Sequence, residues 1–156
     1  MEAWLVNIDD ALRGVATLFL DTAPIIYLVE KHPRYLDVVR PIFEHIDAGT
    51  IRAVTSPITL AECLVQPYRL DQTDLQQAFV TAIIRGKHTD FVSIDQTTAQ
   101  TAAQLRAQYG LTLPDALQLA VALTRQCDAL LTNDVFLKRV SGIRTIVLDE
   151  LELPSG

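Results

Sequence analysis

Short apolar runs rich in β-branched residues alternate along the chain with longer segments of helical periodicity. The runs occupy residues 16–20, 51–55, 91–94, 129–132 and 145–148. Each is short enough to be a strand that is buried on both faces. Between them, apolar residues follow the three-and-four spacing of amphipathic helices, in three stripes: Leu36, Val39, Phe43 and Ile46; Leu75, Ala78, Phe79 and Ala82; and Ala116, Leu119, Ala120 and Leu123. This alternation predicts an α/β fold in which helices cover both faces of a parallel sheet.

Turn-forming residues agree with these boundaries. Ser56 before Pro57 predicts a helix N-cap followed by proline at the first helical position, and Gly49 and Gly110 predict helix ends. Pro41 falls inside a helical stripe, and we expect it to kink or split that helix.

The chain ends lie outside the alternating pattern. Residues 1–15 carry Trp4, Leu5, Ile8 and Leu12 at roughly helical spacing, so we expect a helical extension that packs on its own domain. Residues 16–150 form the main domain, and we expect 151–156 to be a frayed tail.

Composition narrows the class of protein. The 156 residues are 49% hydrophobic, which predicts one compact domain, and the absence of a long apolar run or signal peptide predicts a cytoplasmic protein with no membrane association. The net charge of −6 argues against coating nucleic acid by bulk electrostatics but does not exclude a nuclease. The cysteines and histidines lack the spacing of zinc ligands.

Four acids stand where the chain leaves a predicted strand or enters a predicted helix: Asp21, Glu62, Asp115 and Asp134. No basic residue adjoins any of them in the sequence. Crowded carboxylates repel one another and lose hydration, so they stay ionised only if they are paired, hydrogen-bonded or neutralised by a cation. A hard ion such as Mg²⁺ prefers oxygen ligands, so the pattern indicates a metal site.

Each acid also has a simpler explanation. The pairs Thr59–Glu62 and Thr112–Asp115 match the capping-box spacing, and Asp134 could cap a helix through residues 135–137. Asp21 has only a turn to explain it. Asp95, a rival fifth ligand, is better explained as the cap of the helix that follows.

Basic residues that could contact a nucleic acid fall into two groups. Arg85 and Lys87 form the densest basic segment, although they also suit the end of a helix. Lys138 and Arg139 lie about one turn beyond Asp134 if that segment is helical.

Four motifs in order, LFLDTAPIIYL, SPITLAECL, LTLPDALQLAVAL and LLTND followed by Phe136, resemble the PIN-domain ribonucleases, most closely the VapC-type toxins of bacterial toxin–antitoxin pairs. The resemblance covers residues 16 to about 150. It implies a three-layer α/β/α sandwich and endonuclease activity on RNA that depends on one or two Mg²⁺ or Mn²⁺ ions. It also implies a homodimer that a small antitoxin inhibits.

Carried over by motif, Asp21, Glu62, Asp115 and Asp134 would be the acidic ligands, and Thr132 the hydroxyl residue two positions before the last acid. Ala23 departs from the family, which often has Asn or Ser there.

The leading hypothesis is hydrolysis of an RNA phosphodiester at a metal site formed by the four acids. One alternative is a catalytically silent PIN-like module that binds RNA or a protein partner. Another is a metal-dependent phosphatase with Asp21 as nucleophile, which would need a second acid two residues later.

Overall fold

A parallel five-stranded sheet organises the chain. The computed structural model describes residues 5–154 and places the strands in the order β4-β3-β2-β5-β6. The strands of this sheet are β2 (Thr17–Leu20), β3 (Arg52–Thr55), β4 (Thr89–Phe91), β5 (Ala129–Thr132) and β6 (Arg144–Val147). The helices are α1 (Ile8–Ala11), α2 (Thr22–Val29), α3 (Leu36–Asp47), α4 (Pro57–Arg69), α5 (Thr73–Ile84), α6 (Gln96–Tyr109) and α7 (Leu113–Thr124), with 3₁₀ turns η2 (Val135–Arg139) and η3 (Leu148–Glu150).

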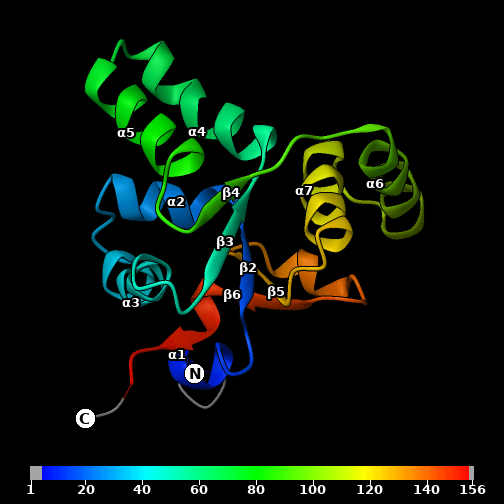
Figure 1. Ribbon diagram of the computed structural model, residues 1–156, viewed down its shortest axis with the longest axis horizontal. Coiled ribbons are helices and arrows are strands. Elements are labelled where there is room, and N and C mark those ends of the chain that lie inside the picture. Colours follow the sequence, from blue (N-terminus) through cyan, green and yellow to red (C-terminus); the bar gives the residue numbers. More distant parts are fainter. Residues whose placement is uncertain (1–4, 155–156) are drawn as a thin grey trace.

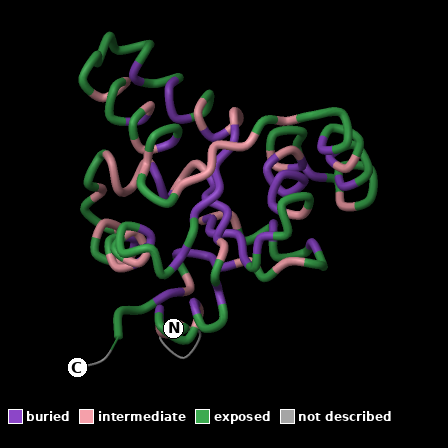
Figure 2. The backbone as a smooth tube through the Cα atoms, viewed as in Figure 1, coloured by how far each residue is buried: buried purple, intermediate pink, exposed green. Residues whose placement is uncertain are grey.

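Helices cover both faces of the sheet, which confirms the predicted three-layer α/β/α sandwich. Figure 1 shows α2, α3, α4 and α5 on one side of the strands and α6 and α7 on the other. Side chains alternate along β2, so that Leu18 and Leu20 enter the core under the first group while Phe19 enters the core under the second. The central strands β2 and β5 are accordingly buried almost throughout, the edge strand β4 is half-buried, and exposure is concentrated on the outer turns of the helices (Figure 2).

The predicted strands are confirmed, with the third shifted toward the N-terminus to 89–91. The three helical stripes correspond to α3, α5 and α7. Ser56 caps α4 by accepting hydrogen bonds from the backbone N–H groups of Ile58 and Thr59. Pro41 does not split α3, which runs unbroken from Leu36 to Asp47. The stabilisation from packing the apolar stripe of this helix exceeds the cost of the hydrogen bond that proline cannot donate.

The two chain ends meet in a small sheet of their own. β1 (Val6–Asn7) pairs in parallel with β7 (Leu151–Glu152), so the expectation of a frayed tail is wrong for residues 151 and 152. Leu151 is buried in the core, which holds this segment in place. The helix expected over residues 1–15 is reduced to the four residues of α1, and Trp4 lies outside the described residues.

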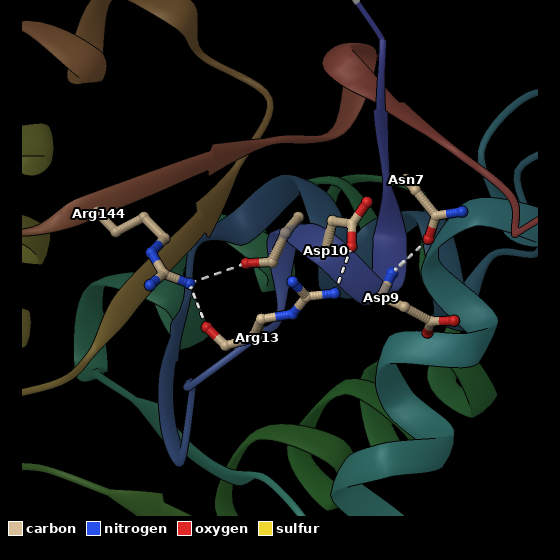
Figure 3. Close-up of polar contacts among 6 residues, drawn as sticks. Asn7, Asp9, Asp10, Arg13 and Arg144 are labelled. Carbon is tan, nitrogen blue, oxygen red and sulfur yellow. Dashed lines mark hydrogen bonds and ion pairs between the residues drawn. The ribbon is translucent and has the colours of Figure 1, made fainter.

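The N-terminal segment packs on its own domain, as expected. Ile8 and Leu12 are buried in the core. Arg144, from β6, donates hydrogen bonds to the carbonyl oxygens of Ala11 at 3.0 Å and Arg13 at 2.8 Å, which ties the segment to the edge of the main sheet (Figure 3). Asn7 caps α1 through the backbone N–H of Asp9 (Figure 3).

Strand order reverses at β2. The chain proceeds from β2 to β3 and β4 on one side, then returns to place β5 on the other side of β2. Ligand sites of open parallel sheets form at such a switch point, beyond the carboxyl ends of the strands. Within residues 5–154, no helix is long and apolar enough to cross a membrane.

Candidate active site at the carboxyl edge of the sheet

Two of the four acids stand at the switch point. Asp21 follows β2 directly, and Asp134 lies two residues past the end of β5, which pairs with β2. Asp21 is 9% exposed and occupies the N-cap position of α2, but its side chain does not cap that helix. Asp134 does cap: its Oδ1 accepts a hydrogen bond from the backbone N–H of Phe136 at 3.0 Å. The helix cap predicted for Asp134 is therefore confirmed. Asp21, in contrast, makes no capping hydrogen bond.

The other two acids come from helices that start at the same edge. Asp115 lies in the first turn of α7, whose N-cap Thr112 accepts a hydrogen bond from the Asp115 backbone N–H at 3.3 Å. The capping interpretation of Glu62 is wrong, because Ser56 is the cap of α4 and Glu62 lies in its second turn. Instead, the Glu62 carboxylate accepts a 2.7 Å hydrogen bond from Thr22, the residue after Asp21. This contact connects the side chain of Glu62 to the end of β2.

Buried polar side chains hold the Asp21 carboxylate from two directions. Thr132, at the end of β5, donates its hydroxyl to Asp21 Oδ2 at 2.7 Å. Gln118, from α7, directs its amide nitrogen to Asp21 Oδ1 at 3.5 Å and to the hydroxyl of Thr59 at 2.7 Å. The Gln118 carbonyl oxygen accepts from the hydroxyl of Ser56. The Asp21 carboxylate is therefore held by residues of β5 and α7, and Gln118 of α7 is in turn bonded to α4 and its N-cap.

The acids act on one another electrostatically. Burial raises the pKa of Asp21 above the ordinary value for aspartate, and the charge of Glu62 adds to this, while the hydrogen bonds from Thr132 and Gln118 counteract it. Burial also raises the pKa of Asp115, with further contributions from the charges of Asp21 and Asp134. Among the described residues, no Lys, Arg or His pairs with any of the four acids. The edge is a region of uncompensated negative charge.

The donor set suits a hard divalent cation in its chemistry, because four carboxylates and a buried hydroxyl supply only oxygen. The geometry, however, is not that of a formed metal site, because no three His, Cys, Asp or Glu side chains of residues 5–154 lie close enough together to hold one ion. Asp21 is fixed by its hydrogen bonds, whereas Glu62 is exposed and Asp115 is partly exposed. The residues fit Mg²⁺ or Mn²⁺ if these two side chains turn toward Asp21.

The basic residues predicted to contact RNA do not share one location. Arg85 and Lys87 precede β4 and therefore lie at the amino ends of the strands, opposite the acids. Lys138 and Arg139 end η2, which follows Asp134 directly. Lys138 forms an ion pair with Glu150 at 2.9 Å. Of these four basic residues, only Arg139 both follows the acidic edge and has no carboxylate partner among the described residues.

Three polar residues of the site escaped prediction from the sequence: Gln118, Thr59 and Thr22. Gln118 could have been found, because it is the one polar residue in LQLAVAL and lies three positions after Asp115, on the stripe that faces the core. Thr22 supplies a polar contact one residue after Asp21, next to the position where Ala23 departs from the family. Asp95 accepts a hydrogen bond from the backbone N–H of Thr98 at 2.9 Å, which confirms its predicted role as the cap of α6. It borders a surface hollow of about 880 Å³ that none of the four acids lines.

A doubly wound parallel sheet with acids at the carboxyl edge near its switch point defines a class of α/β proteins. The PIN domain model matches residues 18–143, most of the chain, and the chain belongs to the PIN domain family. A comparison with curated proteins gives no match.

Solved structures with the same fold include components of toxin–antitoxin complexes. VapBC2 from Rickettsia felis, bound to a DNA fragment from its promoter, is 21% identical with a TM-score of 0.65 over 88% of this chain and 98% of that one. A toxin–antitoxin complex from Klebsiella pneumoniae is 25% identical, with a TM-score of 0.61 over 84% and 97%. VapC20 from Mycobacterium tuberculosis, described as a sarcin–ricin loop cleaving toxin, is 14% identical, with a TM-score of 0.60 over 72% and 86%. The resemblance to the VapC-type fold is confirmed.

Proposed function

We propose that this protein is a metal-dependent endoribonuclease that hydrolyses phosphodiester bonds at the site formed by Asp21, Glu62, Asp115 and Asp134. The observation that carries the proposal is the placement of four acids, which follow β2 and β5 or lie near the starts of α4 and α7, at the carboxyl edge of the sheet, with no basic partner within residues 5–154. Membership in the PIN domain family supports the same reaction class.

The chain's own residues would divide the work as follows. Asp21, Asp115 and Asp134 would hold Mg²⁺ or Mn²⁺, and Glu62, which accepts a hydrogen bond from Thr22, would bind the ion as well or orient the attacking water. One or two such ions, when bound, supply the Lewis acidity that activates water and stabilises charge at the phosphorus. The water oxygen would form a new P–O bond and give up a proton to a carboxylate or to solvent, while the bond to the leaving oxygen breaks and that oxygen takes up a proton from solvent.

Thr132 has a positioning role in this scheme. Its hydroxyl donates to Asp21 and accepts from the backbone N–H of Asp134 at 3.0 Å. It therefore fixes the two acids of neighbouring strands relative to each other. Gln118 does the same for Asp21 from the side of α7.

The test is RNA cleavage by Asp21→Asn. In Mn²⁺, the cleavage rate of Asp21→Asn should fall by more than about 100-fold, a larger loss than the 10- to 100-fold typical of residues that only orient metal ligands. Asp95→Asn is the matched control, because asparagine caps a helix as well as aspartate and Asp95 lies outside the site. Retained cleavage by Asp21→Asn, with the fold intact by circular dichroism, would sink the assignment.

The proposal extends to a role as the toxin of a toxin–antitoxin pair and to assembly as a homodimer. The Klebsiella neighbour is described as a toxin–antitoxin complex, which supports an antitoxin partner here. Expression of this chain alone should arrest growth, and Asp21→Asn should relieve the arrest. Arrest that persists with Asp21→Asn would contradict a toxic nuclease.

A second candidate is a catalytically silent module that binds RNA or a partner. One observation favours it: no three of the described acidic, His or Cys side chains converge on one point. The two candidates differ in metal binding, because a nuclease of this kind must bind Mn²⁺ in its native state. The phosphatase alternative has no such support, since Ala23 stands where the second acid would be needed.

A further inference from the structure

A large aromatic ring stands exposed beside the acids. Phe136 is 66% exposed, the highest value among the exposed large apolar side chains of the described residues. Its neighbour in η2, Leu137, is 1% exposed and fills the core, so the turn has its apolar anchor without Phe136. An exposed phenylalanine ring forgoes the hydrophobic stabilisation that burial would give. Packing within the chain therefore does not account for Phe136.

The backbone that carries the ring is held close to one of the candidate ligands, Asp134. The backbone N–H of Phe136 is hydrogen-bonded to the carboxylate of Asp134, and two residues of chain keep their Cα atoms within about 7 Å. A group lying on the ring is thus close to a phosphate held at the acids. Val135, beside it, is 53% exposed.

A cation lies against the same ring. The Arg139 guanidinium carbon is 5.8 Å from the centroid of Phe136. The guanidinium donates to the carbonyl oxygens of Phe136 at 3.3 Å and Tyr109 at 2.9 Å, which holds it in place. No carboxylate of residues 5–154 pairs with it, in contrast to Lys138, which is neutralised by Glu150. Its charge remains available to an anion.

We propose that Phe136 and Arg139 form a platform for single-stranded RNA, on which Phe136 stacks a base and Arg139 contacts a phosphate next to the cleavage site. An exposed aromatic ring and an uncompensated cation are the two elements by which proteins bind single strands, and stacking serves any base because each has a π-face. A paired base is covered on both faces by its neighbours and offers no face to Phe136. The platform therefore selects an unstacked nucleotide, in a loop or a single strand. This inference rests on the proposed function, since it names the substrate class of that site.

Binding can be separated from cleavage in an Asp21→Asn background. The probe is a fluorescein-labelled oligoadenylate of about 12 nucleotides, in the size range of single-strand sites, followed by fluorescence anisotropy. Phe136→Ala and Phe136→Leu should each raise Kd by about 5- to 100-fold, and Phe136→Trp should keep or lower it. Tyr68→Ala is the matched control: Tyr68 is 60% exposed near the end of α4, away from the acids, and its loss should leave Kd unchanged.

Salt dependence distinguishes the roles of the two residues. Each phosphate contact to a single strand contributes about −0.7 to the slope of log K against log salt. Arg139→Gln should therefore flatten the slope by about that amount, whereas Phe136→Ala should leave the slope unchanged and lower affinity throughout. Lys138→Gln is the control for lost charge and should change the slope less, because Glu150 already compensates Lys138.

Two outcomes overturn the platform. In one, Phe136→Ala binds RNA as well as Tyr68→Ala does, or the parent protein binds no single strand. In the other, Phe136→Leu matches the parent and Phe136→Ala changes the molar mass in sedimentation, which makes the ring an apolar contact between copies of the chain. Failure of the proposed nuclease is a different result: wild-type protein that binds the probe through Phe136 but never cleaves RNA with Mn²⁺.

Discussion

Thr132 connects the two acids that end neighbouring strands. It is fully buried, its hydroxyl donates to Asp21 at 2.7 Å, and it accepts from the backbone N–H of Asp134 at 3.0 Å. β2 and β5 pair in parallel with Leu20 opposite Leu131, so the residues that follow them meet at the same level of the sheet. One hydroxyl thus serves both the positioning of a carboxylate and the backbone turn that presents the next one.

Thr132→Val should show both roles at once. Valine keeps the shape but leaves the Asp134 N–H without its acceptor and Asp21 without its donor, a cost of about 1–3 kcal/mol in the free energy of unfolding. RNA cleavage should fall as well, because Asp21 loses its orientation. Thr132→Ser keeps the hydroxyl and should retain most cleavage. Urea denaturation and initial rates measure the two effects, and a valine variant as active as the serine one would contradict the role given to the hydroxyl.

Gln118→Leu tests the polar network under the site. Gln118 is 1% exposed and is bonded to Ser56, Thr59 and Asp21, so leucine leaves several buried polar groups without a partner. We expect a loss of about 1–3 kcal/mol in unfolding free energy. Gln104→Leu, the same change on an exposed position of α6, should stay within about 0.5 kcal/mol. Equal effects of the two substitutions in urea would show that the network does not contribute.

The raised pKa of Asp21 predicts how stability depends on pH without metal. Native Asp21 keeps its proton to higher pH than Asp21 in the unfolded chain, whose ordinary pKa is 3.8. The native state therefore binds more protons between the two pKa values, and this group makes stability fall as pH rises through that window. In EDTA, Asp21→Asn should gain stability relative to wild type as pH rises from about 4, then level off. A difference in Tm that is constant with pH would contradict this.

The alternation of strands and helices could be predicted because burial on both faces of a parallel sheet leaves a direct trace in apolar runs. The bounds of β4 were harder to predict, because it is an edge strand with partly exposed side chains and the apolar run continues past its end. The frayed tail was wrong for a related reason. A two-residue strand such as β7 depends on a partner, β1, that lies at the other end of the chain.

The order of motifs along the sequence was enough to single out the four acids, but it could not predict which side chains each acid contacts. A three-residue spacing from Thr59 suggested a cap for Glu62, whereas the helix starts three residues earlier at Ser56, so the spacing was coincidental. Gln118 was not among the site residues predicted from the sequence, and only the packing of α7 against α4 gives it Ser56 and Thr59 as partners. The sequence could therefore have singled out Gln118 as a polar residue on a core-facing helix, but not the residues that it contacts.

Addition of Mn²⁺ should separate the nuclease from the silent module. Binding to the native state stabilises by about 2.7 kcal/mol at 100 times Kd, so Tm should rise with Mn²⁺ and return with EDTA. Asp115→Asn should weaken this rise and, in EDTA, be more stable than wild type, because it removes repulsion with Asp21 and Asp134. Asp95→Asn should respond as wild type does. A Tm that ignores Mn²⁺ in the wild type would favour the silent module.

The segment before β2 should be part of the folded domain, although the PIN domain match begins at residue 18. Ile8 is fully buried, so Ile8→Ala should cost about 2–5 kcal/mol in unfolding free energy. Val6→Ala, on a side chain 44% exposed two residues earlier, should cost far less. Urea denaturation followed by circular dichroism measures both. If the segment were only an appendage, Ile8→Ala would leave the main transition where it is. A shifted single transition would show that β1, α1 and β7 unfold together with the sheet that carries the acids.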